Sequence, residues 1–290
     1  MVAQEKAVLI DGNSMTYGWD FHPGLFHNGH RVSGVINFLI NVRKRVMAVG
    51  RRNVLVAWDS RHYDKKKLFP EYKATRKHGA FDEEIWSEID LLKEVLPMIG
   101  IKSEEVKGLE ADQVVASYAL YLKDKGYTDI SILSFDSDLY QLICGQIVVE
   151  TRIGKVDEEV LLFRENLSPD MFRLKKILAG DKSDNIPGIP KFNGHTLRRL
   201  VKIYGNNPQA IMECEELASH RSQIKQNEML VTLKMDVPVD RLQDTWNTRV
   251  TAFRSDDFKR FCLKHGIMRI LQNFPDWIMP FIQQQATVLD

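Results

Sequence analysis

Short apolar runs alternate with segments of helical periodicity along the first half of the chain. The runs AVLID (7–11), NVLVAWD (53–59) and DISILSFD (129–136) each have the length of a strand and end in an acidic residue. Between the first two, apolar side chains recur at the spacing of one helix face, and Gly50 stands where that helix would end. The pattern therefore predicts a strand, a helix and a second strand in the opening segment.

The segment before the third run is also helical in pattern. DQVVASYALYLKDKG (112–126) has an apolar face, with Asp112 in position to cap the helix and Gly126 in position to end it. Continuous apolar strands that alternate with helices are typical of a mostly parallel sheet covered on both faces. We therefore predict an α/β fold with a mostly parallel central sheet flanked by helices.

The pattern changes twice after that. Residues 60–95 begin with a basic stretch that contains a proline and continue as an acidic helix, which indicates an excursion from the sheet. QIVVETRIGKVDEEVLLF (146–163) predicts a hairpin around Gly154, and later segments such as PDMFRLKKILAG and TLRRLVKIYG predict helices. We divide the chain into an α/β core at residues 1–164 and a mainly helical region at 165–290.

Length and composition indicate a globular protein. The 290 residues are 44% hydrophobic and 27% charged, which is enough apolar material for a sizeable core and excludes a disordered chain. Neither a secretory signal nor a run of about 18 apolar residues is present, so we expect a cytoplasmic protein without membrane attachment. The three cysteines are widely spaced and form no C-x-x-C pair, which favours reduced thiols over a zinc site or a disulfide.

Candidate chemistry begins with the acids that end the three runs. The carboxyl ends of parallel strands meet at one edge of a sheet, and ligands of open α/β proteins bind at that edge. Asp11, Asp59 and Asp136 would all lie there. A single terminal aspartate is often only a turn former, but three of them indicate a shared site.

Five further carboxylates belong to the same group of segments. They are Glu110, Asp112, Asp138, Asp181 and Asp184. Two unit charges about 4 Å apart repel by roughly 4 kcal/mol at an effective dielectric near 20, so either several acids hold protons or cations neutralise them. Because no histidine or cysteine accompanies the acids, two Mg²⁺ ions are the expected occupants, and Mn²⁺ could substitute.

Two ions about 3.5 to 4 Å apart suit in-line displacement at phosphorus. The basic side chains of the excursion then have a function, because they could bind backbone phosphates and bring the scissile one to the metals. These side chains are Lys65, Lys73, Arg76 and Lys77. Tyr17, close to the first acid, is the aromatic residue that we expect to stack on a base.

Five ordered motifs between residue 7 and about residue 205 resemble those of the flap endonuclease/5'-3' exonuclease family, which includes the 5' nuclease domain of bacterial A-family DNA polymerases and stand-alone phage 5' nucleases. These motifs are LIDGNSMTY, AWDS followed by KKLFPEYKATR, GLEADQVVAS, SFDSDLYQL and LAGDKSDNIPGIP. Any one of them alone is a weak signal. Their common order and spacing make the resemblance specific.

The resemblance implies a PIN-like 5' nuclease fold and a role for each motif residue. All eight acids would be metal ligands, direct or through water, and Lys65 would contact the scissile phosphate. A helical arch at about 60–95 would admit a free 5' end, and a helix-two-turn-helix at about 169–205 would bind duplex phosphates and hold a K⁺ ion. The side chains of that second motif that we expect to touch DNA are Lys191, His195 and Thr196.

The implied activity is that of a structure-specific 5' nuclease. It would hydrolyse phosphodiester bonds near the 5' ends of flapped, nicked or branched DNA, and it would remove RNA primers from RNA–DNA hybrids or flaps in replication and repair. Since no polymerase domain precedes Asp290, we expect a stand-alone enzyme. We also expect a monomer.

Three positions depart from the family pattern. Gln113 replaces a second consecutive Asp, which removes one negative charge that could support a metal site. Gly18 replaces an Arg of the first motif, which removes a phosphate contact. KFNGHT (191–196) replaces a glycine-rich hairpin turn; Asn193 tolerates a left-handed backbone better than Lys191 does, so the K⁺ site and the duplex contact depend on this turn.

Two alternatives belong to other classes. A haloacid dehalogenase-type phosphatase also has Asp at a strand end, but it needs D-x-D there, and Asn13 occupies the second position. A protein that binds branched DNA without cutting it is compatible with Gln113 and the altered turn. Cleavage assays with and without a chelator distinguish that protein from a nuclease.

Overall fold

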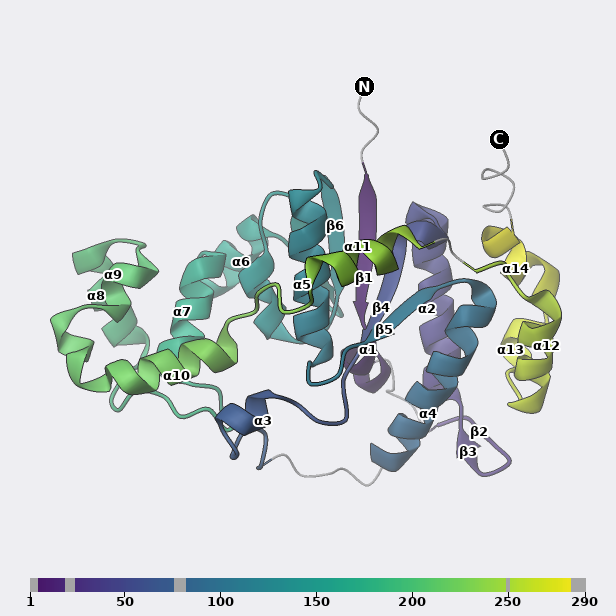
Figure 1. Cartoon of the computed structure of the whole chain (residues 1–290), viewed down its shortest axis with the longest axis horizontal. Coiled ribbons are helices and arrows are strands. Elements are labelled where there is room, and N and C mark those ends of the chain that lie inside the picture. The colour runs from purple at the N-terminus through teal and green to yellow at the C-terminus, as the bar shows by residue number, and fades with distance from the viewer. Residues whose placement is uncertain (1–4, 19–23, 76–81, 249–250, 283–290) are drawn as a thin grey trace.

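The computed structural model describes residues 5–18, 24–75, 82–248 and 251–282. The molecule is elongated, with the sheet near its middle, helices α8 to α10 at one end and helices α12 to α14 at the other (Figure 1). Within the described residues, no helix is both long enough and apolar enough to span a membrane.

A six-stranded sheet forms the centre of the protein. Its strands follow the order β5-β4-β1-β6-β7-β8, and all neighbours are parallel except β7 and β8. The strand bounds are β1 Lys6–Asp11, β4 Val54–Trp58, β5 Lys102–Glu105, β6 Asp129–Leu133, β7 Ile147–Thr151 and β8 Gly154–Val156. A separate two-stranded ribbon is formed by β2 Phe26–His27 and β3 His30–Arg31.

Side chains alternate between the two faces of the sheet, and helices cover both faces. Val8 and Ile10 of β1 belong to one buried cluster, whereas Ala7 and Leu9 belong to the other. The first face is covered by α2 Ser33–Val49, α4 Asp82–Val95, α12 Ser255–Lys264, α13 Met268–Leu271 and α14 Phe274–Ile282, and α1 Gly12–Gly18 lies at its edge. The second is covered by α5 Ala111–Asp124, α6 Glu158–Glu165 and α11 Val239–Asn247.

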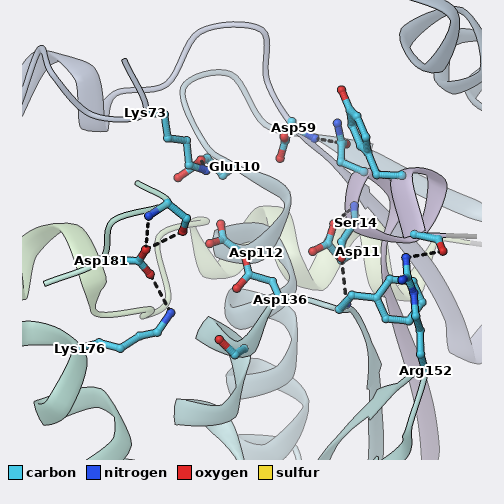
Figure 2. A pocket seen from close by; sticks show the side chains of 16 residues that line it. Asp11, Ser14, Asp59, Lys73, Glu110, Asp112, Asp136, Arg152, Lys176 and Asp181 are labelled. Carbon is cyan, nitrogen blue, oxygen red and sulfur yellow. Dashed lines mark hydrogen bonds and ion pairs between the residues drawn. The ribbon is translucent and has the colours of Figure 1, made fainter. Parts of the chain in front are cut away.

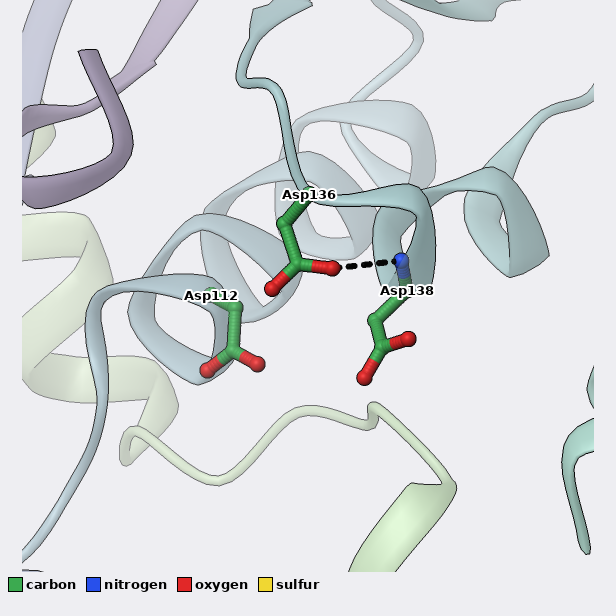
Figure 3. Close-up of side chains that lie close together, drawn as sticks. All are labelled: Asp112, Asp136 and Asp138. Atoms are coloured by element: carbon green, nitrogen blue, oxygen red, sulfur yellow. Dashed lines mark hydrogen bonds between the residues drawn. The ribbon is translucent and has the colours of Figure 1, made fainter. Parts of the chain in front are cut away.

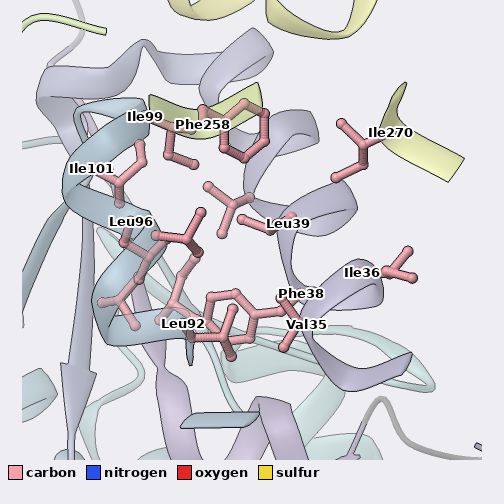
Figure 4. Close-up of a cluster of buried hydrophobic side chains, with 14 of the residues drawn as sticks. Val35, Ile36, Phe38, Leu39, Leu92, Leu96, Ile99, Ile101, Phe258 and Ile270 are labelled. Atoms are coloured by element: carbon pink, nitrogen blue, oxygen red, sulfur yellow. The ribbon is translucent and has the colours of Figure 1, made fainter. Parts of the chain in front are cut away.

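Helix α2 shows how the sequence specifies this packing. Its apolar residues recur every three or four positions, so they form one face that buries completely against the sheet and α4 (Figure 4). Gly50 then ends the helix with a backbone φ of 85°, which an L side chain rarely adopts.

A third cluster forms the end of the molecule near α8. It contains residues from α7 Pro169–Ala179, α8 Gly194–Tyr204, α9 Pro208–Met212 and α10 Arg221–Val231. Tyr72 joins it from the excursion, which contains the short helix α3 Lys65–Leu68. Short 3-10 helices complete the secondary structure at Arg51–Asn53, Leu96–Ile99, Ser137–Leu142 and Glu215–His220.

The predicted strands, the helices beside them and the hairpin around Gly154 are present, and the mostly parallel sheet flanked by helices is confirmed. Asp112 does not cap α5, because Glu110 is the N-cap residue. Packing also divides the predicted region 165–290 in two. Its first part forms the third cluster, but Leu233 to Phe281 contribute to the two clusters that cover the sheet.

Candidate active site

The predicted acids lie where the sheet reverses its direction of winding. From β1 the chain passes to β4 and β5 on one side, and it then returns to the other side of β1 through β6 and β7. Ligands of open α/β proteins bind beside such a switch point. Asp11 ends β1, Asp59 directly follows β4, and Asp136 lies three residues beyond β6.

A pocket of about 490 Å³ opens at this edge (Figure 2). Six of the eight predicted carboxylates line it, together with Tyr17 and Lys73. The six are Asp11, Asp59, Glu110, Asp112, Asp136 and Asp181. The remaining two, Asp138 and Asp184, do not line the pocket but contact residues that do. The structure thus brings together acids from five separate segments.

Asp11 is buried and held by two hydrogen bonds. Its Oδ1 accepts a hydrogen bond from the Ser14 amide (2.9 Å), and its Oδ2 accepts one from the Ser134 hydroxyl (2.9 Å). Burial raises the pKa of Asp11 well above its usual range, and the neighbouring charge of Asp59 raises it further.

Asp59 is held by groups from three different segments. Its Oδ1 accepts from the amide of Ala111 at the start of α5 (2.8 Å), and its Oδ2 accepts from the Tyr63 hydroxyl (3.3 Å). Its own amide donates to the Asn13 side-chain oxygen (2.9 Å). Burial raises the pKa of Asp59. Asn13, whose presence in place of an aspartate disfavours a phosphatase, therefore positions Asp59.

Asp112, Asp136 and Asp138 form the tightest group of acids (Figure 3). Each offers one carboxylate oxygen, and these three oxygens lie within 4.8 Å of one another. Asp136 caps the 3-10 helix that follows β6, because its Oδ1 accepts from the Asp138 amide (2.9 Å). Burial raises the pKa of Asp112 to about 7, against the opposing charge of Lys65.

Glu110 lies in a network of buried polar groups. Lys65 Nζ lies 2.8 Å from its Oε2, the Tyr72 hydroxyl lies 2.9 Å from the same oxygen, and Lys73 pairs with Oε1. Burial alone would raise the pKa of Glu110, but Lys65 and Lys73 bring it down to about 2. The Tyr72 hydroxyl also lies 2.8 Å from Oδ2 of Asp184. Tyr72 therefore links the excursion to Glu110 and to Asp184.

Asp181 lies opposite Asp136 and pairs with a lysine that the motifs did not single out. Lys176 Nζ is 3.0 Å from Asp181 Oδ2, and it also pairs with Asp138. Burial opposes ionisation, but hydrogen bonds from Ser183 and the charge of Lys176 lower the pKa of Asp181 to about 2. Lys176 lies on the last turn of α7, five residues before Asp181. This short spacing was the sequence feature from which the pair could have been predicted.

The basic residues of the excursion differ in position. Lys73 lines the pocket, whereas Lys65 is only 7% exposed and does not line it. Lys73 has a left-handed backbone (φ 56°), which its amide stabilises by donating to the Asp184 carbonyl oxygen (2.9 Å). Arg76 and Lys77 lie outside the described residues.

The turn before α8 differs from the expected one. Lys191, not Asn193, adopts the left-handed backbone, with φ 62°. Asn193 is extended, and its side-chain oxygen accepts from the amides of His195 (2.9 Å) and Thr196 (3.1 Å) to cap α8. His195 Nδ1 lies 3.0 Å from Arg198 Nη2.

Gln113 does not belong to the pocket. Its Oε1 accepts from the Glu110 amide (3.1 Å) and so completes a capping box at the start of α5. Its Nε2 donates to Asp236 Oδ2 (2.9 Å). Gln113, in place of an aspartate, therefore affects the capping of α5 and not the lining of the pocket.

The donor set fits divalent cations. Every acidic side chain in the pocket offers oxygen ligands, which hard divalent ions prefer. The raised pKa values of Asp11, Asp59 and Asp112 show that these carboxylates resist ionisation without a further positive charge. Bound metal would supply that charge and displace the protons.

Fold and pocket together define the class: an α/β protein with an acidic pocket, which offers oxygen ligands for a divalent cation, at the switch point of a mostly parallel sheet. The comparison with known families identifies it further. A profile described as 5'-3' exonuclease, N-terminal resolvase-like domain, matches residues 6–167, and the chain belongs to this family.

Curated relatives include bacterial polymerases. DNA polymerase I of Bacillus caldotenax is 29% identical over 255 residues, which are 82% of this chain and 29% of the polymerase. The thermostable DNA polymerase I of Thermus aquaticus is 29% identical over 248 residues, which are 81% of this chain and 29% of the polymerase. The chain thus spans less than a third of the length of these relatives.

Solved structures share the fold. The T5 D15 protein, crystallised with metal ions, has a TM-score of 0.66 and 17% identity, over 89% of this chain and 97% of that one. The catalytic core of Rad2 in complex with a DNA substrate has a TM-score of 0.55 and 16% identity, over 96% of this chain and 93% of that one.

Proposed function

We propose that this protein is a divalent-metal-dependent 5' nuclease that hydrolyses phosphodiester bonds near the 5' ends of flapped, nicked or branched DNA. The observation that carries the proposal is the convergence of six carboxylates and Lys73 on one pocket, in a chain of the 5'-3' exonuclease family. Relatives named DNA polymerase I and a structural neighbour solved with a DNA substrate support the choice of substrate.

The eight acids have separable roles in this proposal. Asp112, Asp136 and Asp138 would hold one Mg²⁺ or Mn²⁺ ion, because their oxygens already lie within 4.8 Å of one another. Asp11, Asp59 and Glu110 would complete a second position, and Asp181 and Asp184 would bind through water. Two such ions, when bound, activate a water molecule and stabilise the leaving oxygen.

The lysines then have two functions. Lys73, at the pocket wall, is better placed than Lys65 to contact the scissile phosphate. Lys65 would instead fix Glu110 and, through it, the start of α5. Lys176 neutralises Asp138 and Asp181 and would release them when metal binds.

DNA would contact Tyr17 in the pocket and the turn before α8 outside it. Tyr17 lines the pocket and is 40% exposed, which suits stacking on a base. Lys191 and His195 are exposed and Thr196 is half-buried at the start of α8, where backbone phosphates and a K⁺ ion in the preceding loop would bind. The same proposal includes RNA primers on DNA as a substrate. It also includes a monomeric enzyme in the cytoplasm.

The alternative, a protein that binds branched DNA without cutting it, was based on Gln113 and the altered turn. The side chain of Gln113 contacts Glu110 and Asp236 and does not line the pocket, so of these two features only the altered turn still favours that alternative.

The test is cleavage of a 5'-labelled flap substrate across a Mg²⁺ titration. Asp136→Asn and Asp181→Asn should each abolish turnover, because a neutral amide removes a ligand charge but still accepts the hydrogen bonds from Asp138 and Ser183. Asp129→Asn, at the other end of β6 in a surface pair with Lys6, is the matched control. Unchanged turnover in the first two variants would refute the proposed site.

A further inference from the structure

Helix α10 and the loop that follows it lead from the third cluster to the sheet. Ile224 and Leu230 of α10 are buried in the third cluster, together with residues of α7. Leu233 and Val237, in the loop at residues 232–238, are buried in a cluster that covers the sheet. In Figure 1 this loop passes α5 before the chain continues as α11. Neither α10 nor the loop contains a residue that the motifs singled out.

Two amide side chains of α10 hold the loop between α7 and α8, which carries both acids of LAGDKSDNIPGIP. Asn227 is only 1% exposed, and its Nδ2 donates to the carbonyl oxygens of Ile177 and Pro187, both at 2.8 Å. Gln223 Nε2 donates to the carbonyl oxygens of Pro187 and Gly188, both at 3.1 Å. Because Ile177 precedes this loop and Pro187 lies near its end, Asn227 joins the two ends of the loop to α10.

A second acid-bearing segment is attached to the end of α10 by Gln141, which belongs to the same motif as Asp136 and Asp138. Gln141 Nε2 donates to the Asp138 carbonyl oxygen (2.8 Å) and to the Val231 carbonyl oxygen (3.1 Å). Its Oε1 accepts from the Leu233 amide (2.9 Å). One side chain thus connects the backbone of a predicted metal ligand to the last residue of α10 and to the loop after it.

The same loop is attached to α5, which begins with the acids of GLEADQVVAS. The Ser117 hydroxyl oxygen accepts from the amides of Asp236 (2.9 Å) and Val237 (3.1 Å). Gln113 Nε2 donates to Asp236 Oδ2 (2.9 Å). Three of the segments that supply acids to the site are therefore held by one helix and the loop that follows it.

We propose that residues 221–238, here called the α10 segment, set the spacing of these three acid-bearing segments for metal binding, with Gln141 and Asn227 as the positioning residues. The proposal rests on the proposed metal-dependent function for the identity of the ligand. Oxygens of Asp112 and Asp138 come from two of the segments and lie within 4.8 Å of each other. A small shift of either segment would separate them. Loss of groups that orient metal ligands typically lowers metal affinity about 10- to 100-fold.

Substitution of Gln141 tests the attachment to the Asp138 backbone. Gln141→Met keeps the length of the side chain and adds no charge, but it loses all three hydrogen bonds. Binding of Mn²⁺ to the protein without DNA, measured by electron paramagnetic resonance of the free ion, should weaken by about 10-fold. The Mg²⁺ midpoint for flap cleavage should rise by about the same factor. At saturating Mg²⁺, kcat and the KM for DNA should change by less than about threefold.

Gln146→Met is the matched control. Gln146 is exposed and does not line the pocket, so the same substitution there should change the Mn²⁺ affinity by less than about twofold. A merely structural role for Gln141 would lower the stability of Gln141→Met in urea but leave the Mn²⁺ affinity of the folded protein unchanged. That result would overturn the proposal.

Substitution of Asn227 tests the attachment at the other end. Asn227→Ala should weaken Mn²⁺ binding by about 3- to 10-fold, less than Gln141→Met, because the loop that it holds carries acids proposed to bind through water. Gln223→Ala removes contacts with the same loop from a half-buried position, and it replaces Asn227→Ala if that variant does not fold.

The double variant Gln141→Met, Asn227→Ala tests whether one support holds both segments. Since the spacing is lost once either attachment is broken, the double variant should bind Mn²⁺ within about twofold of the weaker single variant. Full multiplication of the two effects would show that each residue acts on its own segment alone, which would contradict a shared support.

The Mn²⁺ assay separates this proposal from the nuclease function. If the wild type binds Mn²⁺ with an affinity that depends on Gln141 but cuts no flap, the positioning role stands and the nuclease function fails. If the wild type cuts flaps and both single variants match it in Mn²⁺ affinity, the nuclease function stands and the positioning role is refuted. A wild type that binds no Mn²⁺ would refute both.

Discussion

Substitution of Gln113 by Asp should destabilise the protein without improving its metal site. Gln113 Nε2 donates to Asp236 Oδ2 at 2.9 Å, and Gln113 Oε1 accepts from the Glu110 amide. The substitution replaces a donor with a second carboxylate. Loss of a hydrogen bond to a charged group costs about 1.5–3 kcal/mol, and the new repulsion adds to this.

The repulsion follows from the geometry. An aspartate is one methylene shorter than glutamine, so the two carboxylates would lie about 5 Å apart, which costs about 3 kcal/mol at an effective dielectric of 20. The side chain of Asp236 is 18% exposed and Lys234 lies 3.9 Å from it, so screening reduces this to about 1 kcal/mol. We expect a total loss of about 3 kcal/mol in the free energy of unfolding.

Urea denaturation of four proteins measures the effect: the wild type, Gln113→Asp, Asp236→Asn and the double variant. Asp236→Asn keeps an oxygen acceptor for Gln113 and should change stability by less than about 1 kcal/mol. The double variant restores a donor and an acceptor, so it should recover at least half of the loss. A Gln113→Asp protein with wild-type stability and a lower Mg²⁺ midpoint for cleavage would show that the side chain faces the metals, against our reasoning.

Two further predictions concern the turn before α8 and the cysteines. Lys191→Gly should raise the free energy of unfolding by up to about 1 kcal/mol in thermal denaturation, because a left-handed backbone (φ 62°) strains an L side chain; a decrease would mean that the lysine side chain makes a stabilising contact. With Ellman's reagent at pH 8, Cys144, which is half-buried, should react first. Cys214 and Cys262 are buried, and burial raises the pKa of Cys262 to about 12, so both should react only as fast as the protein unfolds; three equal rates would contradict this burial.

Much of the fold was predictable because its strands are apolar on both faces. Such runs have the length of strands and are too short for typical helices, and those of β1, β4 and β6 end in acids that mark the functional edge. Strand β5 was not predicted, since its residues KSEE have no apolar pattern. The backbone of β5 pairs with β4 at the edge of the sheet, and such pairing is difficult to predict from the local sequence.

The set of acids in the site was predictable, but the contacts between them and the cations were not. Spacing along the chain indicated which carboxylates approach one another. It could not show that Lys176 pairs with Asp138 or that Tyr72 lies between Glu110 and Asp184, because these contacts join segments far apart in sequence. The position of Gln113 was misjudged for the same reason, since Asp236 belongs to a distant loop.

The return of the chain to the sheet after the third cluster has a consequence for dissecting the protein. The family profile ends at residue 167, yet Phe258, Phe261, Trp277 and Phe281 complete the apolar layer over α2. The segment that the profile matches is thus smaller than the set of residues that pack together on the sheet. A fragment cut at the profile boundary would lack this aromatic layer and would expose the apolar side chains of α2 that it covers, so its solubility should be measured before its catalytic activity.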